Sequence, residues 1–117
     1  MIKIIVRVKD REEGTYVVVS DEFTVGRDAT GNFIVLPNLG VSRTHARFYQ
    51  VDHRWHIEDL GSANGVQVNG HNIMKTPLRH GDVIAIGPNH TLTFINTGVD
   101  PSQSFENTVR IDRPPRS

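Results

Sequence analysis

The segment VSRTHARF, residues 41–48, brings three side chains that could bind a ligand or take part in catalysis within four positions of one another. Its length and alternation are typical of a β-strand, but Ser42, Arg43 and His45 stand at its front end, where packing alone does not require them. A hydroxyl, a guanidinium and an imidazole at the start of a strand can bind an anion, or can supply parts of a hydrolytic triad. The two chemistries require different partners elsewhere in the chain.

Other loop segments carry polar residues that suit the first of these chemistries. Arg27 follows a glycine at the end of a strand-like stretch, and its planar guanidinium matches the geometry of a phosphate or a carboxylate. Residues 59–65, DLGSANG, contribute Asn64, whose amide has both donors and an acceptor and can hydrogen-bond a peptide main chain. Together with Ser42 and Arg43, these side chains suit a phosphate group that is attached to a peptide.

Size and composition limit the classes of protein to consider. The chain has 117 residues, the size of one ordinary domain, and 37% of them are hydrophobic, which is enough for a core. The 13 Lys and Arg residues balance the 13 Asp and Glu residues, which disfavours a nucleic-acid partner because such domains usually carry a basic excess. There is no cysteine, so disulfides and thiolate metal sites are excluded. No apolar run approaches the about 20 residues of a membrane span, and no signal-peptide pattern is present, so we expect a cytoplasmic protein without a membrane partner.

Apolar and polar residues alternate with a period of two along most of the chain, and no segment has a sustained helical stripe. This pattern predicts an all-β fold, an antiparallel β-sandwich of about 10–11 short strands. The expected strands lie at residues 2–8, 15–20, 22–25, 33–36, 44–51, 54–59, 66–68, 71–73, 83–86 and 91–95. Asn69-Gly70 is a strong signal for a two-residue hairpin. Because loops at one end of a sandwich converge, we expect the polar loops to form one site.

The composition changes after Asn96, where prolines and small polar residues replace the strand alternation. We therefore expect one domain over residues 1–96 and a linker or flexible C-terminal tail over residues 97–117.

Four motifs in order, GR, VSRTHARF, DLGSANGVQVNG and LRHGDVIAIG, resemble the motif series of the forkhead-associated (FHA) domain. The resemblance runs from about Ile2 to Ile95 and implies an eleven-stranded β-sandwich that binds phosphothreonine peptides through loops at one end. It implies no catalysis, no cofactor and no metal ion.

The resemblance also implies a role for individual residues. Arg27 would hold the phosphate, Ser42 would donate its hydroxyl to it, and Arg43 would add positive charge. Asn64 would hydrogen-bond the peptide main chain beside the phosphothreonine. His45 would brace the binding loops from behind.

Further loop residues have implied structural roles. Gly26 and Gly65 would shape the turns. Some family members have a threonine before the asparagine that helps to hold the phosphate, but Ala63 stands there in this chain, so that contact is absent. Ser62 either substitutes for it or only holds the loop, and the sequence leaves both roles open.

A hydrolase is the first alternative to a binding module. Ser42, His45 and Asp59 have the residue types of a nucleophile, a base and an orienting carboxylate. However, the serine and the histidine lie only three residues apart at a strand start, and no nucleophile elbow or oxyanion hole is evident. This reading is disfavoured.

The histidines do not form a metal-binding pattern. His53 and His56 are three residues apart, which points them to opposite faces of a strand. His71, His80 and His90 lie in separate predicted turns, where histidines are mostly exposed.

The sequence therefore predicts a phosphothreonine-dependent binding module in signalling. The alternative is a phosphate-independent scaffold domain for protein association, and the presence of Arg27, Ser42 and Asn64 together favours the first. The chain also lacks the aromatic stacking platform that a nucleic-acid-binding domain would need.

The tail supplies a candidate ligand of its own. Ile111 follows Thr108 at the third position, a spacing similar to ligands that the FHA family prefers. Phosphorylated Thr108 would then bind the domain's own site or that of a neighbouring copy.

Overall fold

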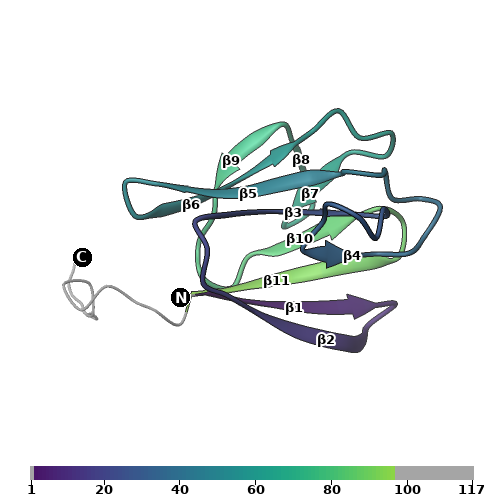
Figure 1. The fold of residues 1–117 in the computed structure, drawn as a ribbon, viewed down its shortest axis with the longest axis horizontal. Coiled ribbons are helices and arrows are strands. Elements are labelled where there is room, and N and C mark those ends of the chain that lie inside the picture. Colours follow the sequence, from purple (N-terminus) through teal and green to yellow (C-terminus); the bar gives the residue numbers. More distant parts are fainter. Residues whose placement is uncertain (1, 97–117) are drawn as a thin grey trace.

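The computed structural model describes residues 2–96, which form two β-sheets packed face to face (Figure 1). The six-stranded sheet has the order β2-β1-β11-β10-β7-β8 and contains β1 (Ile2–Val8), β2 (Arg11–Val18), β7 (Val66–Val68), β8 (His71–Ile73), β10 (Val83–Ile86) and β11 (His90–Asn96). The five-stranded sheet has the order β4-β3-β5-β6-β9 and contains β3 (Glu22–Gly26), β4 (Ile34–Val35), β5 (Ala46–Val51), β6 (Arg54–Asp59) and β9 (Lys75–Pro77). The prediction of an all-β sandwich is confirmed, and the expected tail lies outside the described residues.

The core forms where the inward faces of the two sheets meet. Alternation places Trp55 and Ile57 of β6 on this inward side, and both are buried. Phe48 of β5 is fully enclosed, and its ring stacks on that of Phe23 in β3 with centroids 4.6 Å apart. Phe94 of β11 closes the core from the six-stranded sheet. This apolar layer makes the sandwich a rigid support for its loops.

The strands differ from the prediction in three places. β9 (Lys75–Pro77) has no alternation to reveal it and exists because it pairs with β6. β2 begins at Arg11 rather than at residue 15, because the Lys9-Asp10 turn folds it back onto β1. Both turn residues have positive φ, 50° and 68°, as a type I′ hairpin requires, although neither is glycine. In addition, β4 runs parallel to β3, whereas the other pairs are antiparallel as expected.

The loops that concern function lie together at one end of the sandwich. In Figure 1, β1 begins and β11 ends at the left, and the connections β3–β4, β4–β5 and β6–β7 lie at the right. The β10–β11 turn belongs to this right-hand end as well, because Gly87 packs against the backbone of Gly40 in the β4–β5 loop. The expected Asn69-Gly70 hairpin is present between β7 and β8, with φ values of 52° and 86°. The described residues contain no helix that is long and apolar enough to cross a membrane.

His90 departs from its predicted environment. The prediction placed it in an exposed turn, but it is the first residue of β11 and only 5% of it is exposed. Pairing with Val8 of β1 and Ile86 of β10 draws it into the sheet. Because the charged ring is disfavoured where water is excluded, burial lowers the pKa of His90, and the Glu13 carboxylate opposes this shift.

The lowered pKa makes stability depend on pH. The folded state resists protonation of His90, whereas the unfolded chain takes up the proton near its ordinary pKa of 6.5. The free energy of unfolding should therefore be fully retained above that pH and should decrease as the pH falls through it. Urea unfolding at about pH 7.5 and about pH 5.5 measures the loss, which should be smaller in His90→Gln. An equal loss in both proteins would contradict this assignment.

Candidate functional site

Arg27 is held by the loop that follows β4. Its backbone N–H donates to the carbonyl of Ser42 over 2.9 Å, and the N–H of Asp28 donates to the carbonyl of Arg43 over 3.2 Å. These bonds prolong the β3–β5 pairing past the end of β3. The guanidinium Nε of Arg27 donates to the carbonyl of Val41 over 3.0 Å. This last bond fixes the plane of the guanidinium and leaves its terminal N–H groups for a ligand.

Of the arginines near this end, Arg27 and Arg43 keep their charge available for a ligand, whereas Arg47 does not. Arg47 lies on β5 between two carboxylates, 3.2 Å from Glu22 and 3.4 Å from Glu58. Within residues 2–96, no carboxylate lies within 4 Å of Arg27 or of the exposed Arg43. Two guanidinium groups without internal counter-ions flank the same loop, so this end of the sandwich favours an anion.

Ser42 and Asn64 bind the β4–β5 loop to the β6–β7 loop. The hydroxyl oxygen of Ser42 accepts a hydrogen bond from the N–H of Ala63 over 3.0 Å. The amide Nδ2 of Asn64 donates to the carbonyl of Gly40 over 2.7 Å. The hydroxyl proton of Ser42 and the amide oxygen of Asn64 remain for a ligand. Both side chains are thus oriented before any ligand arrives, which lowers the entropy cost of binding.

His45 lies behind these loops and is fully buried. Its Nδ1 accepts a hydrogen bond from the backbone N–H of Ser42 over 3.0 Å, so the ring proton belongs on Nε2. Nε2 then donates to the carbonyl of Gly65 over 2.8 Å. One neutral imidazole therefore links the β4–β5 loop to the β6–β7 loop.

These hydrogen bonds leave no arrangement of a hydrolytic triad. Both ring nitrogens of His45 bind backbone groups, so neither contacts the Ser42 hydroxyl. The carboxylate of Asp59 accepts from the backbone N–H of Ser62 over 2.8 Å instead of orienting the imidazole. The Ser62 hydroxyl in turn accepts from the N–H of Gly65 over 2.9 Å, which closes the loop on itself.

Asn32 is a site residue that the sequence did not reveal. It lies in the β3–β4 loop, and its Nδ2 donates to the carbonyls of Asp28 and Arg43, each over 2.8 Å. It thereby fastens the loop that carries Arg27 to the loop that carries Ser42. An asparagine in the segment DATGN is equally typical of a simple turn, so nothing local distinguishes the two roles.

Gly26 is required by the close approach of two backbones. A Cβ at this position would lie 2.2 Å from the carbonyl oxygen of Arg43, and rigid main chain cannot yield as a side chain can. Gly65 is required for a different reason, its φ of 79°. We expect Gly26→Ala to lower the free energy of unfolding by about 1–3 kcal/mol or more.

The matched control for Gly26→Ala is Gly14→Ala. Its Cβ would meet nothing closer than a ring carbon of Tyr16 at 3.9 Å, so the free energy of unfolding should hardly change. Urea unfolding of the two variants tests the contrast. Equal stabilities would show that the loop after β3 yields more easily than its contacts indicate.

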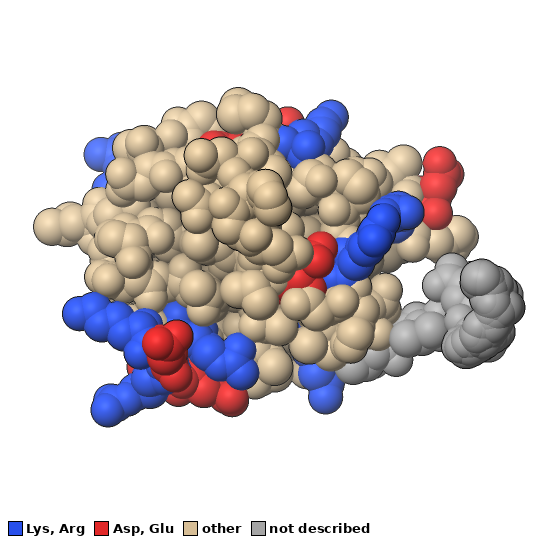
Figure 2. All heavy atoms as spheres, turned by 180° about the vertical axis from the view of Figure 1, so that it is seen from behind, with Lys and Arg blue, Asp and Glu red and all other residues tan. Residues whose placement is uncertain are grey.

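On the face turned toward the viewer in Figure 2, positive side chains are accompanied by negative ones. Several blue side chains gather with red ones at the lower left, a red and a blue side chain lie together to the right of the middle, and much of the rest of the face is uncharged. Among the described residues, no group of three or more His, Cys, Asp or Glu side chains is arranged to hold a metal ion.

Comparisons with known proteins show the family to which the chain belongs. The family model for the FHA domain matches residues 23–87, so the chain belongs to the FHA family. Domains of this family bind phosphothreonine peptides. An FHA domain-containing protein of Arabidopsis thaliana is 35% identical over 82 residues, which cover 68% of this chain and 21% of that protein. The oxoglutarate dehydrogenase inhibitor of Corynebacterium jeikeium is 32% identical over 83 residues, which cover 71% and 57%. The chain thus spans less than two thirds of these relatives.

Solved structures show the same sandwich. The FHA domain of CT664 from Chlamydia trachomatis is 30% identical and superimposes with a TM-score of 0.73, over 81% of this chain and 96% of that one. The MEK1 FHA domain in complex with a phosphothreonine peptide of HOP1 is 25% identical, with a TM-score of 0.66 over 80% of this chain and 96% of that one.

Proposed function

We propose that this domain is a signalling module that binds phosphothreonine segments of partner proteins through the loops after β3, β4 and β6. The terminal N–H groups of Arg27 bind two oxygens of the phosphate, and the hydroxyl of Ser42 donates to it. Arg43, which is exposed on the same loop as Ser42, adds charge at the rim. The amide of Asn64 binds the peptide main chain beside the phosphothreonine.

The observation that carries this proposal is the linkage of the three loops. Hydrogen bonds from Arg27 to Val41 and from Asn64 to Gly40 hold a cationic fork and a peptide-binding amide against two adjacent residues of the β4–β5 loop segment. Ser42 lies on that segment, with its hydroxyl oxygen already positioned by a backbone N–H. Donors of this kind, fixed in advance, suit a phosphate whose peptide chain runs across the loops.

The remaining loop residues support the shape of the binding loops. We assign Gly26 and Gly65 to turn geometry and His45 to bracing. Ser62 is assigned to holding its own loop, because its hydroxyl already accepts from the N–H of Gly65. Both ring nitrogens of His45 bind backbone groups. These residues therefore supply a binding site and no general base.

The test uses an oriented library of phosphothreonine peptides to select a sequence, which is then titrated calorimetrically in phosphorylated and unphosphorylated form. The phosphate should raise the affinity by at least about a hundredfold, since several charge-assisted hydrogen bonds depend on it. Equal affinity for both forms would refute phosphate reading and would support the scaffold alternative.

Thr108 lies outside the described residues, and self-recognition through it is a further part of the proposal. Its support is the aliphatic Ile111 at the third following position. A peptide spanning residues 103–114 with phosphorylated Thr108, titrated into the unphosphorylated full chain, should bind in a way that Arg27→Ala abolishes. Absence of binding at millimolar peptide would end this part of the proposal.

A further inference from the structure

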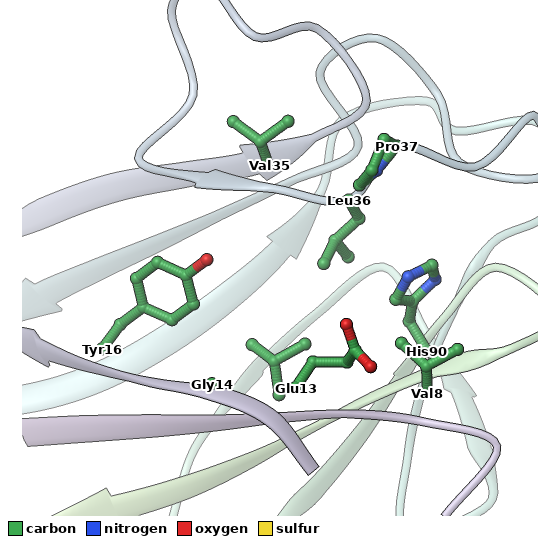
Figure 3. Close-up of a pocket in the computed structure, with 9 residues that line it drawn as sticks. Val8, Glu13, Gly14, Tyr16, Val35, Leu36, Pro37 and His90 are labelled. Carbon is green, nitrogen blue, oxygen red and sulfur yellow. The ribbon is translucent and has the colours of Figure 1, made fainter. Parts of the chain in front are cut away.

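A cavity beside the loops described above opens between the two sheets (Figure 3). Its volume is about 120 Å³, and it lies where β1, β2 and the start of β11 face β4. Six of the lining residues are aliphatic or aromatic, although polar atoms make up more of the exposed lining; these residues are Val6, Val8, Tyr16, Val35, Leu36 and Pro37. Gly14 also lines the cavity, whose polar side-chain groups are the Glu13 carboxylate, the His90 imidazole and the Tyr16 hydroxyl. A cavity of this size is large enough for one side chain of another molecule.

Two features of β2 create this cavity. The register of β2 against β1 shifts where Gly14 pairs with Val6 and Glu12 pairs with Arg7, so Glu13 is an extra, bulged residue. Bulges redirect side chains, and Figure 3 shows the Glu13 carboxylate at the cavity beside His90. Gly14 follows and has no side chain to fill the space. The space is open, because a Cβ at this position would meet no atom closer than 3.9 Å.

His90 presents a hydrogen-bond donor to the cavity. Its Nδ1 is closed off from solvent and has no hydrogen-bond partner among the described residues. The ring nitrogen that faces the cavity in Figure 3 is therefore Nε2. A buried N–H without an acceptor is rarer in proteins than a buried lone pair without a donor, which favours the proton on Nε2. Burial lowers the pKa of His90, so the ring carries this single proton at neutral pH.

The surrounding charges restrict what can enter. Within residues 2–96, Glu13 has no cation within 4 Å. Its carboxylate therefore repels an anionic ligand. Lys9 and Arg11 line an adjoining hollow together with Val8 and Glu13, and their charges offset the attraction of the Glu13 carboxylate for a cationic ligand. An ammonium group also has no acceptor for the Nε2–H of His90. The cavity thus suits a neutral group that both accepts and donates hydrogen bonds and that is attached to a short apolar stem.

We propose that this cavity binds the carboxamide side chain of a glutamine in a protein partner. The amide oxygen accepts from Nε2–H of His90, the amide NH₂ donates to the carboxylate of Glu13, and the methylene groups contact the apolar walls. Leu36 hydrogen-bonds Gly26, the residue before Arg27, so the cavity adjoins the loops assigned to phosphate. A partner held at one site can reach the other, but the pocket does not depend on phosphate recognition.

The experiment uses NMR titration of the full 117-residue chain with three probes of equal length, butyramide, butylamine and butyrate. Butyramide should shift the side-chain signals of His90 and Tyr16 in a saturable way, whereas the amine and the acid should not. Glu13→Ala should weaken butyramide by about threefold to tenfold, because a charge-assisted hydrogen bond is lost. The long-range ¹H–¹⁵N correlations of the His90 ring should show the proton on Nε2.

Gly14→Leu should abolish the butyramide shifts by filling the cavity, and Thr15→Leu, on the exposed neighbouring position of β2, is its matched control. Spectra of both variants show whether the fold is kept. No saturation at about 100 mM butyramide would overturn the proposal, as would equal responses to all three probes. Neither outcome bears on phosphopeptide binding, so the two functions can fail separately.

Discussion

Replacing Arg27 with alanine is expected to weaken a cognate phosphothreonine peptide by roughly tenfold to more than a hundredfold, as measured by calorimetry. Each charge-assisted hydrogen bond to the phosphate contributes about 1.5–3 kcal/mol, and Arg27 can make two of them. The substitution also removes the bond from Nε to the carbonyl of Val41, so a loss of about 1 kcal/mol in the free energy of unfolding is expected. The effect on affinity should clearly exceed the effect on stability.

Two variants separate the guanidinium from charge in general. Arg27→Lys keeps one positive charge but loses both the fork and the Nε donor, so most of the affinity should still be lost. Arg54→Ala removes an exposed arginine at the start of β6, where the β5–β6 hairpin lies at the opposite end of the sandwich in Figure 1. It should leave affinity unchanged. If Arg54→Ala and Arg27→Ala weakened binding equally, the phosphate site would lie elsewhere.

Replacing His45 with alanine should lower both stability and affinity. The variant leaves the N–H of Ser42 and the carbonyl of Gly65 without their partner, the fully buried His45 side chain. Unpaired buried groups and the cavity together should reduce the free energy of unfolding by about 3 kcal/mol. For a domain of this size the melting temperature should fall by more than about 10 °C.

The affinity loss in His45→Ala has a distinct origin from that in Arg27→Ala. His45 has no group left to offer a ligand, and it acts by keeping Ser42 and the β6–β7 loop in register. His71→Ala, an exposed histidine on β8, is the control and should be silent in thermal melting and in calorimetry. A His45→Ala protein with unchanged melting temperature and unchanged affinity would remove the bracing assignment.

Strands and their inward faces could be predicted because their signal is local. In β1, the alternation of Ile2, Ile4 and Val6 with polar residues determines which side is buried, whatever the rest of the chain does. Asn69-Gly70 likewise specifies its own turn, since both residues tolerate positive φ. The order of the four motifs is likewise a property of the sequence, and it indicates the FHA family. The short strand β9 could not be predicted in this way, because it forms through its pairing with β6 and has no local alternation of its own.

The contacts within the site could not be predicted, because they join residues that are far apart in the chain. The sequence left Ser62 with two roles, and its bond to the N–H of Gly65 depends on how the β6–β7 loop closes. Asn32 gained its role only when β3 and β5 paired and brought the carbonyl of Arg43 within reach. The tautomer of His45 follows in the same way from the two loops between which it lies.

The environment of His90 shows most clearly what only the tertiary structure decides. In the sequence it is a histidine after a Pro-Asn turn, which local rules place in solvent. In the fold, the register of β11 against β1 and β10 buries it, and a bulge in β2 brings Glu13 to the same cavity. Register and bulges are set by the summed packing of two sheets rather than by neighbours in the chain, so no local pattern carries them. The sequence alone determined which residues could bind a phosphate, and the pairing of distant strands decided which of them meet.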